Sequence, residues 1–226
     1  MYKTVKRIAD FILSLIVILF LAPFMVPISI LLLLTAEHKL LYIQERIGHR
    51  NKPFLILKFA TMLKASPTMG TGSITLRNDP RVTSVGRFLR KTKFNEVPQL
   101  FNVLIGDMSL IGPRPLMKVD FQKYPEDIQQ TIYNVKPGIT SLASVIFRDE
   151  ERCLSETDMD PHEFDRKYIA PYKGQLEMWY QDNISLSTDL KILIYTILVV
   201  ILPRRKYTFS CLKDLPGKPL FFKDKL

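Results

Sequence analysis

One uncharged apolar run constrains this chain more than any other feature. Residues 11–34, FILSLIVILFLAPFMVPISILLLL, form a stretch of 24 residues without a charged side chain. As a helix the run would reach about 36 Å, enough to cross a bilayer core of roughly 30 Å. The basic residues before it also fit the start of a secretory signal peptide, but the run is longer than the apolar part of such a peptide and no cleavage site follows it. We therefore predict a retained membrane segment.

Two prolines, Pro23 and Pro27, lie inside this run. Proline removes a backbone donor and tends to kink a helix, although membrane helices tolerate it. The segment is therefore either a kinked helix that spans the bilayer or a helix that is broken at its midpoint and leaves the membrane on the side it entered. Both flanks are net positive, and positively charged flanks stay in the cytoplasm. Charge supports re-entry, while the residues alone leave both interpretations open.

Positive charge is concentrated directly after the apolar run. The net charge is +10, and residues 35–118 hold 14 Lys and Arg against 5 Asp and Glu. This pattern suits anionic lipid headgroups, phosphorylated substrates or nucleic acid. Cys153 and Cys211 match no metal or redox spacing, so we expect a reducing, cytoplasmic environment.

The chain after the apolar run predicts a mainly helical α+β domain. Residues 38–60 contain two short apolar stretches around GHRNKP, which predicts a β-hairpin. Residues 64–81 are rich in Gly, Ser, Thr and Pro and predict a loop. Helical spacing returns over residues 83–105, with one helix beginning near Asn95.

A second apolar segment, residues 184–202, is too short to span a bilayer comfortably after its last charge. Asp189 and Lys191 interrupt it, and the basic PRRK (203–206) follows. This pattern favours an amphipathic helix on the cytoplasmic membrane face. A buried core helix is the alternative.

The stretch KFNEVPQLFN (93–102) places an amide, Asn95, against a carboxylate, Glu96, within the basic segment. A single carboxylate among arginines indicates phosphate chemistry, because the planar fork of arginine donates two hydrogen bonds to phosphate at once. The alternative is that the pair is only the polar start of a helix that Pro98 helps to shape.

The loop GDMSLIGPRP (106–115) would hold Arg114 rigidly, since a glycine and two prolines surround it. Rigid placement suits a side chain that meets charge developing during a reaction. On local grounds Arg114 could instead cap a helix C-terminus. A solvated or lipid-facing surface is the alternative for the other arginines of the segment, which are Arg77, Arg81, Arg87 and Arg90.

Several motifs in order resemble one protein family. They are QERIGHRNKPFLILKFATM (44–62), RNDPRVTSVGRFLRKTKFNEVPQLFNVLIGDMSLIGPRP (77–115) and KPGIT (136–140). This set resembles the bacterial sugar transferase family, the monotopic phosphoglycosyl transferases that begin glycan assembly on polyprenol phosphate. The resemblance extends from KRIADFILS (6–14) to SLSTDLKILIYTI (185–197), and the length is similar to that of the small members that consist of the catalytic core.

The resemblance implies an activity. A sugar-1-phosphate would move from a nucleotide diphosphate sugar, usually UDP-linked, to undecaprenyl phosphate, with UMP and a polyprenyl diphosphate sugar as products and Mg²⁺ as the required ion. This would be the first membrane step of O-antigen, capsule, exopolysaccharide or glycoprotein assembly. The expected partners are undecaprenyl phosphate, a UDP-sugar and inner-membrane lipids; we expect no nucleic acid, and a homodimer stays open.

The resemblance also implies a monotopic fold at the bacterial inner membrane, with the active site on the cytoplasmic face. Its membrane helix would be re-entrant and broken near a Ser-Pro pair, where this chain has Ala22 and Pro23. We expect a small β-hairpin, interfacial amphipathic helices and three parts: a re-entrant, kinked membrane helix (1–36), a cytoplasmic catalytic domain (37–206) and a C-terminal tail (207–226).

The sequence departs from the family at Asn95, where members commonly have an Asp that accepts the phosphoryl group and binds Mg²⁺. An amide oxygen can still bind Mg²⁺, but it lacks the charge and nucleophilicity of a carboxylate. Three options remain. Glu96 is the nucleophile while Asn95 orients the metal or the phosphate; or the lipid phosphate attacks directly, with Glu96 as metal ligand or base; or the chain is inactive.

Motif position assigns further residues to phosphate binding. KFATM has Ala60 where many members have arginine, while Lys58 and Thr61 keep a cation and a hydroxyl nearby. The residues assigned in this way are Lys58, Thr61, Arg77, Arg81, Arg90, Arg114 and Lys136. The alternative to an enzyme is a non-catalytic, membrane-anchored basic module that binds anionic lipid or nucleic acid, but a purely electrostatic surface needs no such motif order.

Overall fold

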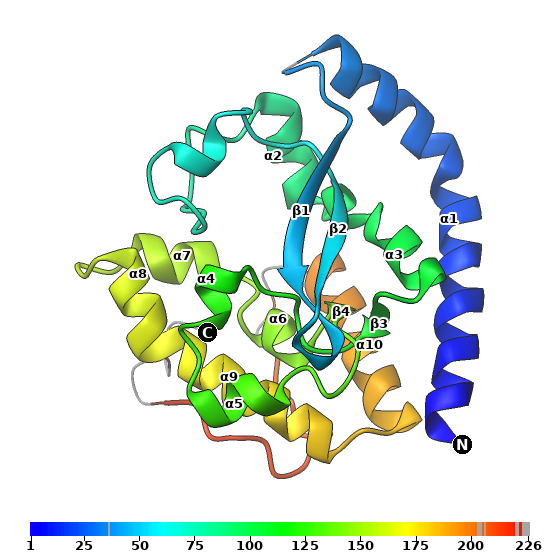
Figure 1. Ribbon diagram of the computed structural model, residues 1–226, viewed down its shortest axis with the longest axis vertical. Helices are drawn as coiled ribbons and strands as arrows, with labels where there is room; N and C mark the ends of the chain where they lie inside the picture. Colours follow the sequence, from blue (N-terminus) through cyan, green and yellow to red (C-terminus); the bar gives the residue numbers. More distant parts are fainter. Residues whose placement is uncertain (36, 203–204, 206, 220–221, 223–226) are drawn as a thin grey trace.

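A computed structural model describes residues 1–35, 37–202, 205, 207–219 and 222. One long helix lies along a body of short helices and a β-hairpin (Figure 1). This confirms the prediction of a mainly helical fold with a small hairpin. The helices are α1 (Tyr2–Leu34), α2 (Ser84–Lys91), α3 (Gln99–Ile105), α4 (Lys118–Phe121), α5 (Glu126–Thr131), α6 (Leu142–Ile146), α7 (Glu150–Ser155), α8 (Pro161–Phe164), α9 (Ala170–Asp182) and α10 (Leu186–Ile201). The strands are β1 (Leu41–Ile47), β2 (Pro53–Phe59), β3 (Ser109–Ile111) and β4 (Gly138–Thr140).

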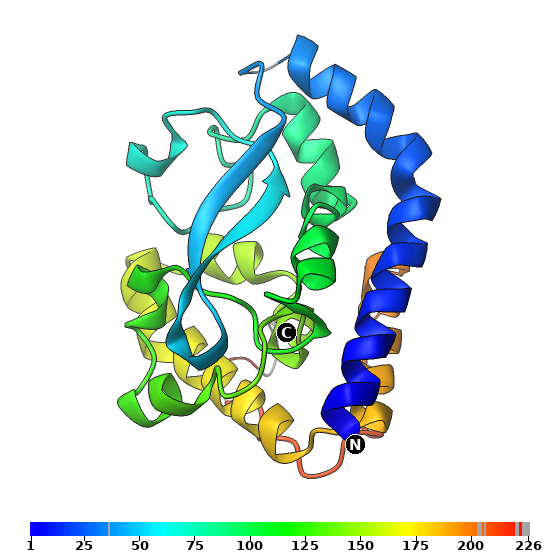
Figure 2. The ribbon, with the colours of Figure 1, turned by 45° about the vertical axis from the view of Figure 1, so that its right-hand side comes forward.

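Helix α1 stays helical through both Pro23 and Pro27. It bends over one side of the body, as Figures 1 and 2 show. Within the described residues it is the one helix long and apolar enough to cross a membrane, with a mean hydropathy of 2.8. Most of its apolar side chains are exposed, because little of the body packs against it. The apolar segment of the sequence is therefore a helix with an unpartnered apolar surface.

Polar contacts fix the first turns of α1 to the body. Lys6 Nζ lies 2.8 Å from Asp189 Oδ2 of α10. The Asp10 carboxylate accepts a hydrogen bond of 2.7 Å from Ser109 Oγ at the start of β3. Asp10 is itself buried, so these contacts are shielded from solvent. The N-terminal end of α1 is thus fixed against α10 and β3.

The C-terminal end of α1 packs on a different part of the same body. Leu32 is buried in an apolar cluster with Phe59 of β2 and Leu89 of α2. Apolar burial of this kind stabilises by about 25 cal/mol for each Å² removed from water. Both ends of α1 therefore contact one body.

The predicted hairpin forms between β1 and β2, which pair antiparallel with Tyr42 opposite Lys58 and Arg46 opposite Phe54. Side chains alternate between the two faces of a strand. Tyr42, Gln44 and Arg46 consequently share one face, and Lys58 joins them from the opposite strand.

A glycine pair sets the position of the loop after β3. Strands β3 and β4 pair in parallel, and the Gly112 N–H donates to the Thr140 carbonyl over 3.1 Å. A Cβ added to Gly138 would lie 2.2 Å from the Gly112 nitrogen, so a side chain there would push the segments apart. The motifs LIGPRP and KPGIT thus meet through glycines.

Helix α9 lies in the largest core, where Leu176 and Tyr180 are buried. The described part of the expected C-terminal tail packs on it, since Trp179 Nε1 donates to the Lys213 carbonyl over 3.1 Å. Helix α10 buries one side, including Ile192, and exposes apolar side chains on the other. Of the basic PRRK after it, Pro203, Arg204 and Lys206 lie outside the described residues.

Candidate active site

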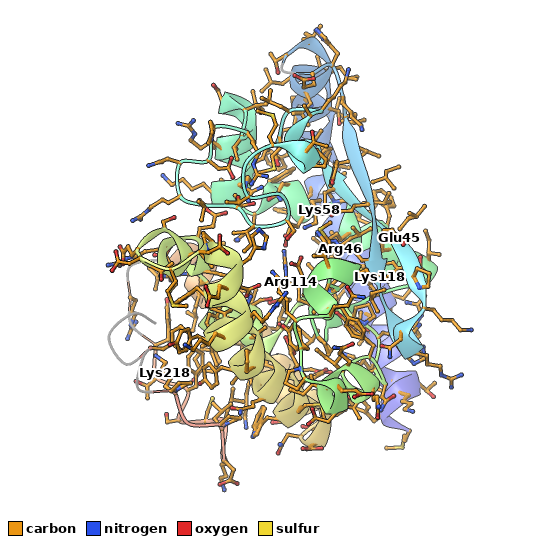
Figure 3. The ribbon with its side chains drawn as sticks, turned by 60° about the vertical axis from the view of Figure 1, so that its left-hand side comes forward. Glu45, Arg46, Lys58, Arg114, Lys118 and Lys218 are labelled. Carbon is orange, nitrogen blue, oxygen red and sulfur yellow. The ribbon has the colours of Figure 1, made fainter. Side chains whose placement is uncertain are left out.

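A cavity of about 940 Å³ lies between the hairpin, the segment from α2 to Glu96, and helices α6, α7 and α9. Figure 3 shows Arg46, Lys58 and Arg114 close together at this place. The residues predicted from the sequence that line the cavity are Lys58, Thr61, Arg77, Arg90, Asn95, Glu96 and Arg114.

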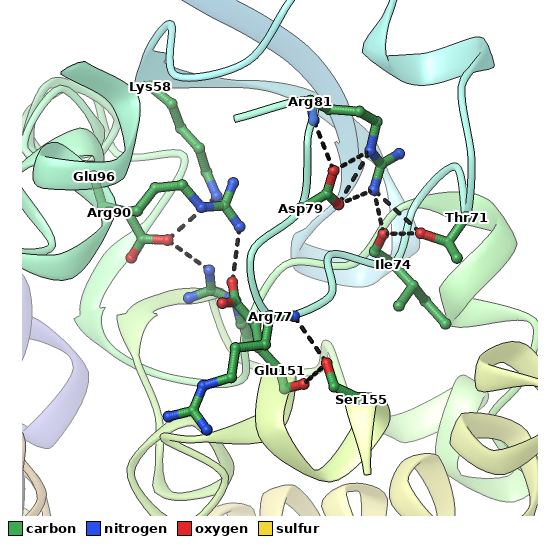
Figure 4. A network of polar contacts seen from close by, with 11 residues as sticks. Lys58, Thr71, Ile74, Arg77, Asp79, Arg81, Arg90, Glu96, Glu151 and Ser155 are labelled. Carbon is green, nitrogen blue, oxygen red and sulfur yellow. Dashed lines mark hydrogen bonds and ion pairs between the residues drawn. The ribbon is translucent and has the colours of Figure 1, made fainter. Parts of the chain in front are cut away.

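Glu96 stands on a short 3₁₀ turn, Phe94–Glu96, rather than inside a helix. The helix predicted to begin near Asn95 begins instead at Gln99, after Pro98. Glu96 Oε1 accepts from Arg114 Nη2 over 2.6 Å and from Lys58 Nζ over 3.3 Å. Figure 4 shows the approach of Lys58 to Glu96. The fold thus brings a strand, a turn and a loop together at one carboxylate.

The charges around Glu96 change the protonation of the site. Burial alone would raise the pKa of Glu96, but Arg114 and Lys58 outweigh it and hold this pKa well below its usual range. Burial lowers the pKa of Lys58 to about 7, helped by the charges of Arg114 and Arg46 and opposed by Glu96. Glu96 is therefore a carboxylate at neutral pH.

Arg46 is a site residue that the sequence analysis missed. It donates to Gln44 Oε1 over 2.6 Å, while its buried Nε has no hydrogen-bond partner among the described residues. Burial, followed by the charge of Arg114, lowers the pKa of Arg46 to about 10, so it stays charged at pH 7. The alternation of β1, which puts Arg46 on the same face as Lys58, was the signal that could have identified it.

The cavity centre therefore has more positive than negative charge. Within the described part of the chain, Glu96 is the one carboxylate that forms ion pairs with any of Arg46, Lys58 and Arg114. Burying cations without matching anions is unfavourable. An anion with about two charges would balance the group, which is the charge of a diphosphate.

Asn95 lies beside this group with its side chain buried, and its Oδ1 has no partner in the described structure. The described residues contain no cluster of three or more His, Cys, Asp or Glu that could hold a metal ion alone. Mg²⁺ commonly uses only one or two protein carboxylates, with waters and substrate phosphates completing its shell. The unpartnered amide oxygen of Asn95 and the Glu96 carboxylate fit that type of site.

Three other predicted residues, Thr61, Arg77 and Arg90, also line the cavity. Arg90 pairs with Glu151 of α7 at 3.0 Å. The backbone N–H of Arg77 donates to Ser155 Oγ over 2.8 Å, and its side chain is exposed. The backbone of Thr61 packs directly on α2, because a Cβ at Gly86 would lie 2.1 Å from the Thr61 carbonyl oxygen.

The assignment of Arg81 to phosphate is corrected by the structure. Arg81 is 2% exposed and does not face the cavity. Its guanidinium pairs with Asp79 at 2.6 Å and holds the preceding loop, as Figure 4 shows. The loop carbonyls that accept from it are those of Ser66, Met69, Gly72 and Ile74. Its donors are used inside the protein, so none is left for a phosphate.

Lys136 is also absent from the cavity lining. Burial, and next the charge of Arg7 on α1, lowers the pKa of Lys136. It therefore belongs to the surroundings of the N-terminal end of α1 and not to those of Glu96, contrary to the expectation from its motif.

Comparison with known proteins gives one family and several relatives. The model of the bacterial sugar transferase family matches residues 1–203. An undecaprenyl-phosphate galactose phosphotransferase from Salmonella typhimurium is 32% identical over 213 residues, covering 88% of this chain and 41% of the relative. A UDP-glucose:undecaprenyl-phosphate glucose-1-phosphate transferase from Escherichia coli is 33% identical over 192 residues, covering 84% and 40%.

A third relative acts on a different sugar. It is a UDP-N-acetylgalactosamine-undecaprenyl-phosphate N-acetylgalactosaminephosphotransferase from Aeromonas hydrophila, 32% identical over 207 residues, covering 88% of this chain and 44% of the relative. The chain thus spans less than half the length of these three relatives. Their names specify three different sugars, so these similarities select none.

Proposed function

Because the chain belongs to the bacterial sugar transferase family, we propose that it transfers a sugar-1-phosphate from a UDP-sugar to undecaprenyl phosphate, releasing UMP. The product is a polyprenyl diphosphate sugar, which begins the assembly of an O-antigen, capsule, exopolysaccharide or glycoprotein glycan. The observation that supports this most is the largely buried Glu96 carboxylate among Lys58, Arg114 and Arg46, in a cavity with surplus positive charge.

The three cations have a direct task in this reaction. Arg46 and Arg114 would bind the diphosphate of the nucleotide sugar, and Lys58 would gain a proton as that charge arrives, since its pKa lies near 7 in the ligand-free protein. Fixed cations in a water-poor site stabilise the charge that develops on the departing UMP.

Glu96 has two roles that fit its protonation. Its depressed pKa makes it a carboxylate at neutral pH and a weak base, which favours nucleophile or metal ligand over general base. As a nucleophile, one oxygen attacks the phosphorus that bears the sugar and the bond from that phosphorus to UMP breaks. The undecaprenyl phosphate oxygen then attacks the same phosphorus and releases Glu96. In the second route the lipid phosphate attacks directly.

Asn95 Oδ1 and Glu96 would hold Mg²⁺ together with the substrate diphosphate. The ion would supply neutralising charge at the phosphate oxygens. Asn95 contributes no charge of its own, so its role is to orient.

The membrane arrangement is part of the proposal. A helix that crosses a bilayer separates its ends by about 30 Å of hydrocarbon, yet both ends of α1 contact one body, through Lys6 and Leu32. We therefore propose that α1 re-enters the cytoplasmic leaflet of the inner membrane as a monotopic anchor, with the exposed apolar side of α10 at the same membrane surface.

Single cysteines test re-entry. With Cys153 and Cys211 changed to serine, cysteines introduced at Tyr2 and Thr35 should both react with an impermeant thiol reagent from the cytoplasmic side only. Reaction of one from each side would mean a spanning helix.

UMP release tests the activity. The full chain, in detergent and in nanodiscs, is supplied with Mg²⁺, undecaprenyl phosphate and a panel of UDP-sugars that includes UDP-glucose, UDP-galactose and UDP-N-acetylgalactosamine. We expect UMP release with at least one sugar. Release with none, in both environments, would favour a basic membrane module that binds anionic lipid or nucleic acid.

Two experiments separate the chemical routes. Incubation with the UDP-sugar alone should leave a phosphosugar adduct on Glu96, mapped by mass spectrometry, if Glu96 is the nucleophile. Direct attack leaves none. In Asn95→Asp a second carboxylate faces the cations, and a sharp rise in activity would mean that Asn95 occupies the nucleophile position in a weakened form.

A further inference from the structure

Glu177 is a carboxyl group that neither the sequence motifs nor the proposed reaction uses. It lies on α9, is 2% exposed, and lines the same cavity as Glu96. Its Oε2 is buried without a hydrogen-bond partner among the described residues. No ion pair involves it in the described structure, whereas Glu150, another carboxylate of the cavity, pairs with Lys173 at 2.5 Å. A buried carboxyl group with so little compensation needs a functional or structural reason.

The backbone around Arg114 gives such a reason. Arg114 stands between two prolines, which have no N–H, so its own N–H is one of very few that can hold this loop. Tyr133 holds the other side: its hydroxyl donates to the Arg114 carbonyl over 2.7 Å and accepts from the Leu116 N–H over 2.9 Å. The Arg114 N–H interacts with the carboxyl group of Glu177. Glu177 and Tyr133 therefore fix the Arg114 peptide from both sides.

The surroundings of Glu177 make its charge sensitive to pH. Burial raises the pKa of Glu177 to about 7, and the Ser141 hydroxyl, the Arg114 N–H and the charges of Lys173 and Arg114 limit the rise. The other titratable groups that interact with it are Tyr124 and Tyr133, whose own pKa values burial raises, so both are neutral at pH 7. Glu177 is thus protonated below pH 7 and ionised above it.

We propose that Glu177 is a positioning residue that acts on the reaction through Arg114, by holding the Arg114 peptide so that the guanidinium meets Glu96 and the substrate diphosphate. An ionised acceptor binds an N–H roughly twice as strongly as a neutral one. The ionised form therefore holds Arg114 best, so the ratio of wild-type kcat/KM to that of a protein with a neutral residue at position 177 rises as pH increases through about 7. The loss of the Lys58 charge over the same range lowers both values and cancels in this ratio. This inference rests on the proposed function, because it assigns Arg114 to the diphosphate.

Glu177→Gln is the main test, since glutamine keeps the shape and stays uncharged. We expect kcat/KM of the variant at pH 8 to be about tenfold below that of the wild type and the two values to converge near pH 5.5, so that their ratio rises through pH 7. The matched control is Glu150→Gln, which removes a paired cavity carboxylate and whose kcat/KM ratio to wild type should stay constant through pH 7. Ser141→Ala removes a hydroxyl that lowers the Glu177 pKa, so Glu177 should ionise at higher pH and kcat/KM should fall furthest below wild type near pH 7, even if Glu177→Gln folds poorly.

A double-mutant cycle separates positioning from other roles. In Arg114→Lys the further change Glu177→Gln should have less than a twofold effect, because the residue it positions is already altered. Three results would overturn the proposal: an unchanged pH profile in Glu177→Gln, additive effects in the cycle, or a loss that depends on which sugar the donor contains, which would mean direct substrate contact.

UDP binding keeps this inference separate from the proposed function. If the wild type releases no UMP, the affinity for UDP is measured by calorimetry across pH 5.5 to 8.5. A ratio of wild-type to Glu177→Gln affinity that rises through pH 7 would support positioning of Arg114 without turnover. Equal affinity in both proteins at every pH would overturn it.

Discussion

Arg81 and Arg114 are two arginines of one basic segment with opposite surroundings. The Arg81 side chain is 3% exposed and its guanidinium is fully occupied by Asp79 and by carbonyls of its own loop. The Arg114 side chain is 39% exposed and pairs with the single carboxylate Glu96. A buried network in which every donor and acceptor is paired stabilises a fold and has no group left to bind a ligand. A network with unpaired donors or acceptors lowers stability, but its unpaired groups are available to a ligand.

The same contrast extends to the two regions as wholes. The loop around Arg81 uses its polar groups internally, whereas the cavity contains unpartnered atoms on Arg46, Asn95 and Glu177. Proteins leave buried polar groups without hydrogen-bond partners mainly at sites that bind a ligand or carry out a reaction. The comparison therefore predicts that changes near Arg81 alter stability and that changes near Glu96 alter activity.

The largest effect is expected at Glu96. Glu96→Gln keeps the volume but removes the charge that Arg114 and Lys58 surround, so either catalytic role is lost. We expect kcat to fall about 10²–10³-fold or more, since removing one preorganised electrostatic group from an active site has an effect on this scale. UMP release measures it.

Glu151→Gln is the control, because Glu151 lines the cavity but pairs with Arg90, whereas Glu96 pairs with Lys58 and Arg114. It should retain at least half of the wild-type rate. A near-normal rate in Glu96→Gln would exclude both catalytic roles. It would also contradict the prediction that changes near Glu96 alter activity whereas changes near Arg81 alter stability.

At Arg81 the expected effect is on stability. Arg81→Met removes the guanidinium from several carbonyls and from the buried Asp79 carboxylate, which keeps only the backbone N–H of residue 81 among the donors that Arg81 supplies. Breaking a buried pair costs about 3–5 kcal/mol. Denaturant unfolding should show this loss. The control Arg77→Met changes an exposed side chain near the same loop and should shift stability by less than about 0.5 kcal/mol. Equal stability of the two variants would mean that the Arg81 network does not hold the loop.

The sequence was sufficient for the parts that local pattern determines. The uncharged run predicted α1, and the turn chemistry of GHRNKP predicted the hairpin between β1 and β2. Motif order predicted Glu96, Lys58 and Arg114 at one site, and both Lys58 and Arg114 pair with Glu96. These features depend on composition, spacing or family resemblance, all of which a single sequence contains.

Tertiary packing decides what the sequence could not predict. Arg81 and Arg77 look alike in the chain, and only the fold of the loop shows that its carbonyls surround Arg81. Glu177 lies in a segment without a recognisable motif, and its burial depends on how α9 packs. Lys136 begins a motif that meets the Arg114 loop, yet its side chain lies near Arg7 of α1.

Acid should weaken the Arg81 region first. Hydrogen bonds from Arg81 hold the pKa of Asp79 below its ordinary value, against the opposing effect of burial. A carboxylate with a depressed folded pKa contributes stability above its unfolded pKa of about 3.9 and loses it as pH falls through the folded value. Unfolding free energy should therefore drop below pH 4 by about 2 kcal/mol, the scale of a hydrogen bond to a charged group. In Asp79→Asn this drop in unfolding free energy below pH 4 should be absent. If the variant shows the same drop as the wild type, other carboxylates cause it.

Arg46 gives the smallest and most selective effect. Its buried Nε has no partner among the described residues, so the free protein gains little from its charge, whereas a bound diphosphate would gain a cation. Arg46→Gln should raise the KM for the UDP-sugar about tenfold, which is about 1.4 kcal/mol of binding, change kcat less than threefold, and leave stability equal or slightly higher. Steady-state kinetics measure KM and kcat, and denaturant unfolding measures stability.

The control is Arg87→Gln, which changes an exposed residue of the cavity lining and should change KM less than twofold. A loss of stability without a change in KM would show that Arg46 supports the fold, as Arg81 does, although its Nε has no partner. The distinction between the Arg81 loop and the cavity would then be wrong.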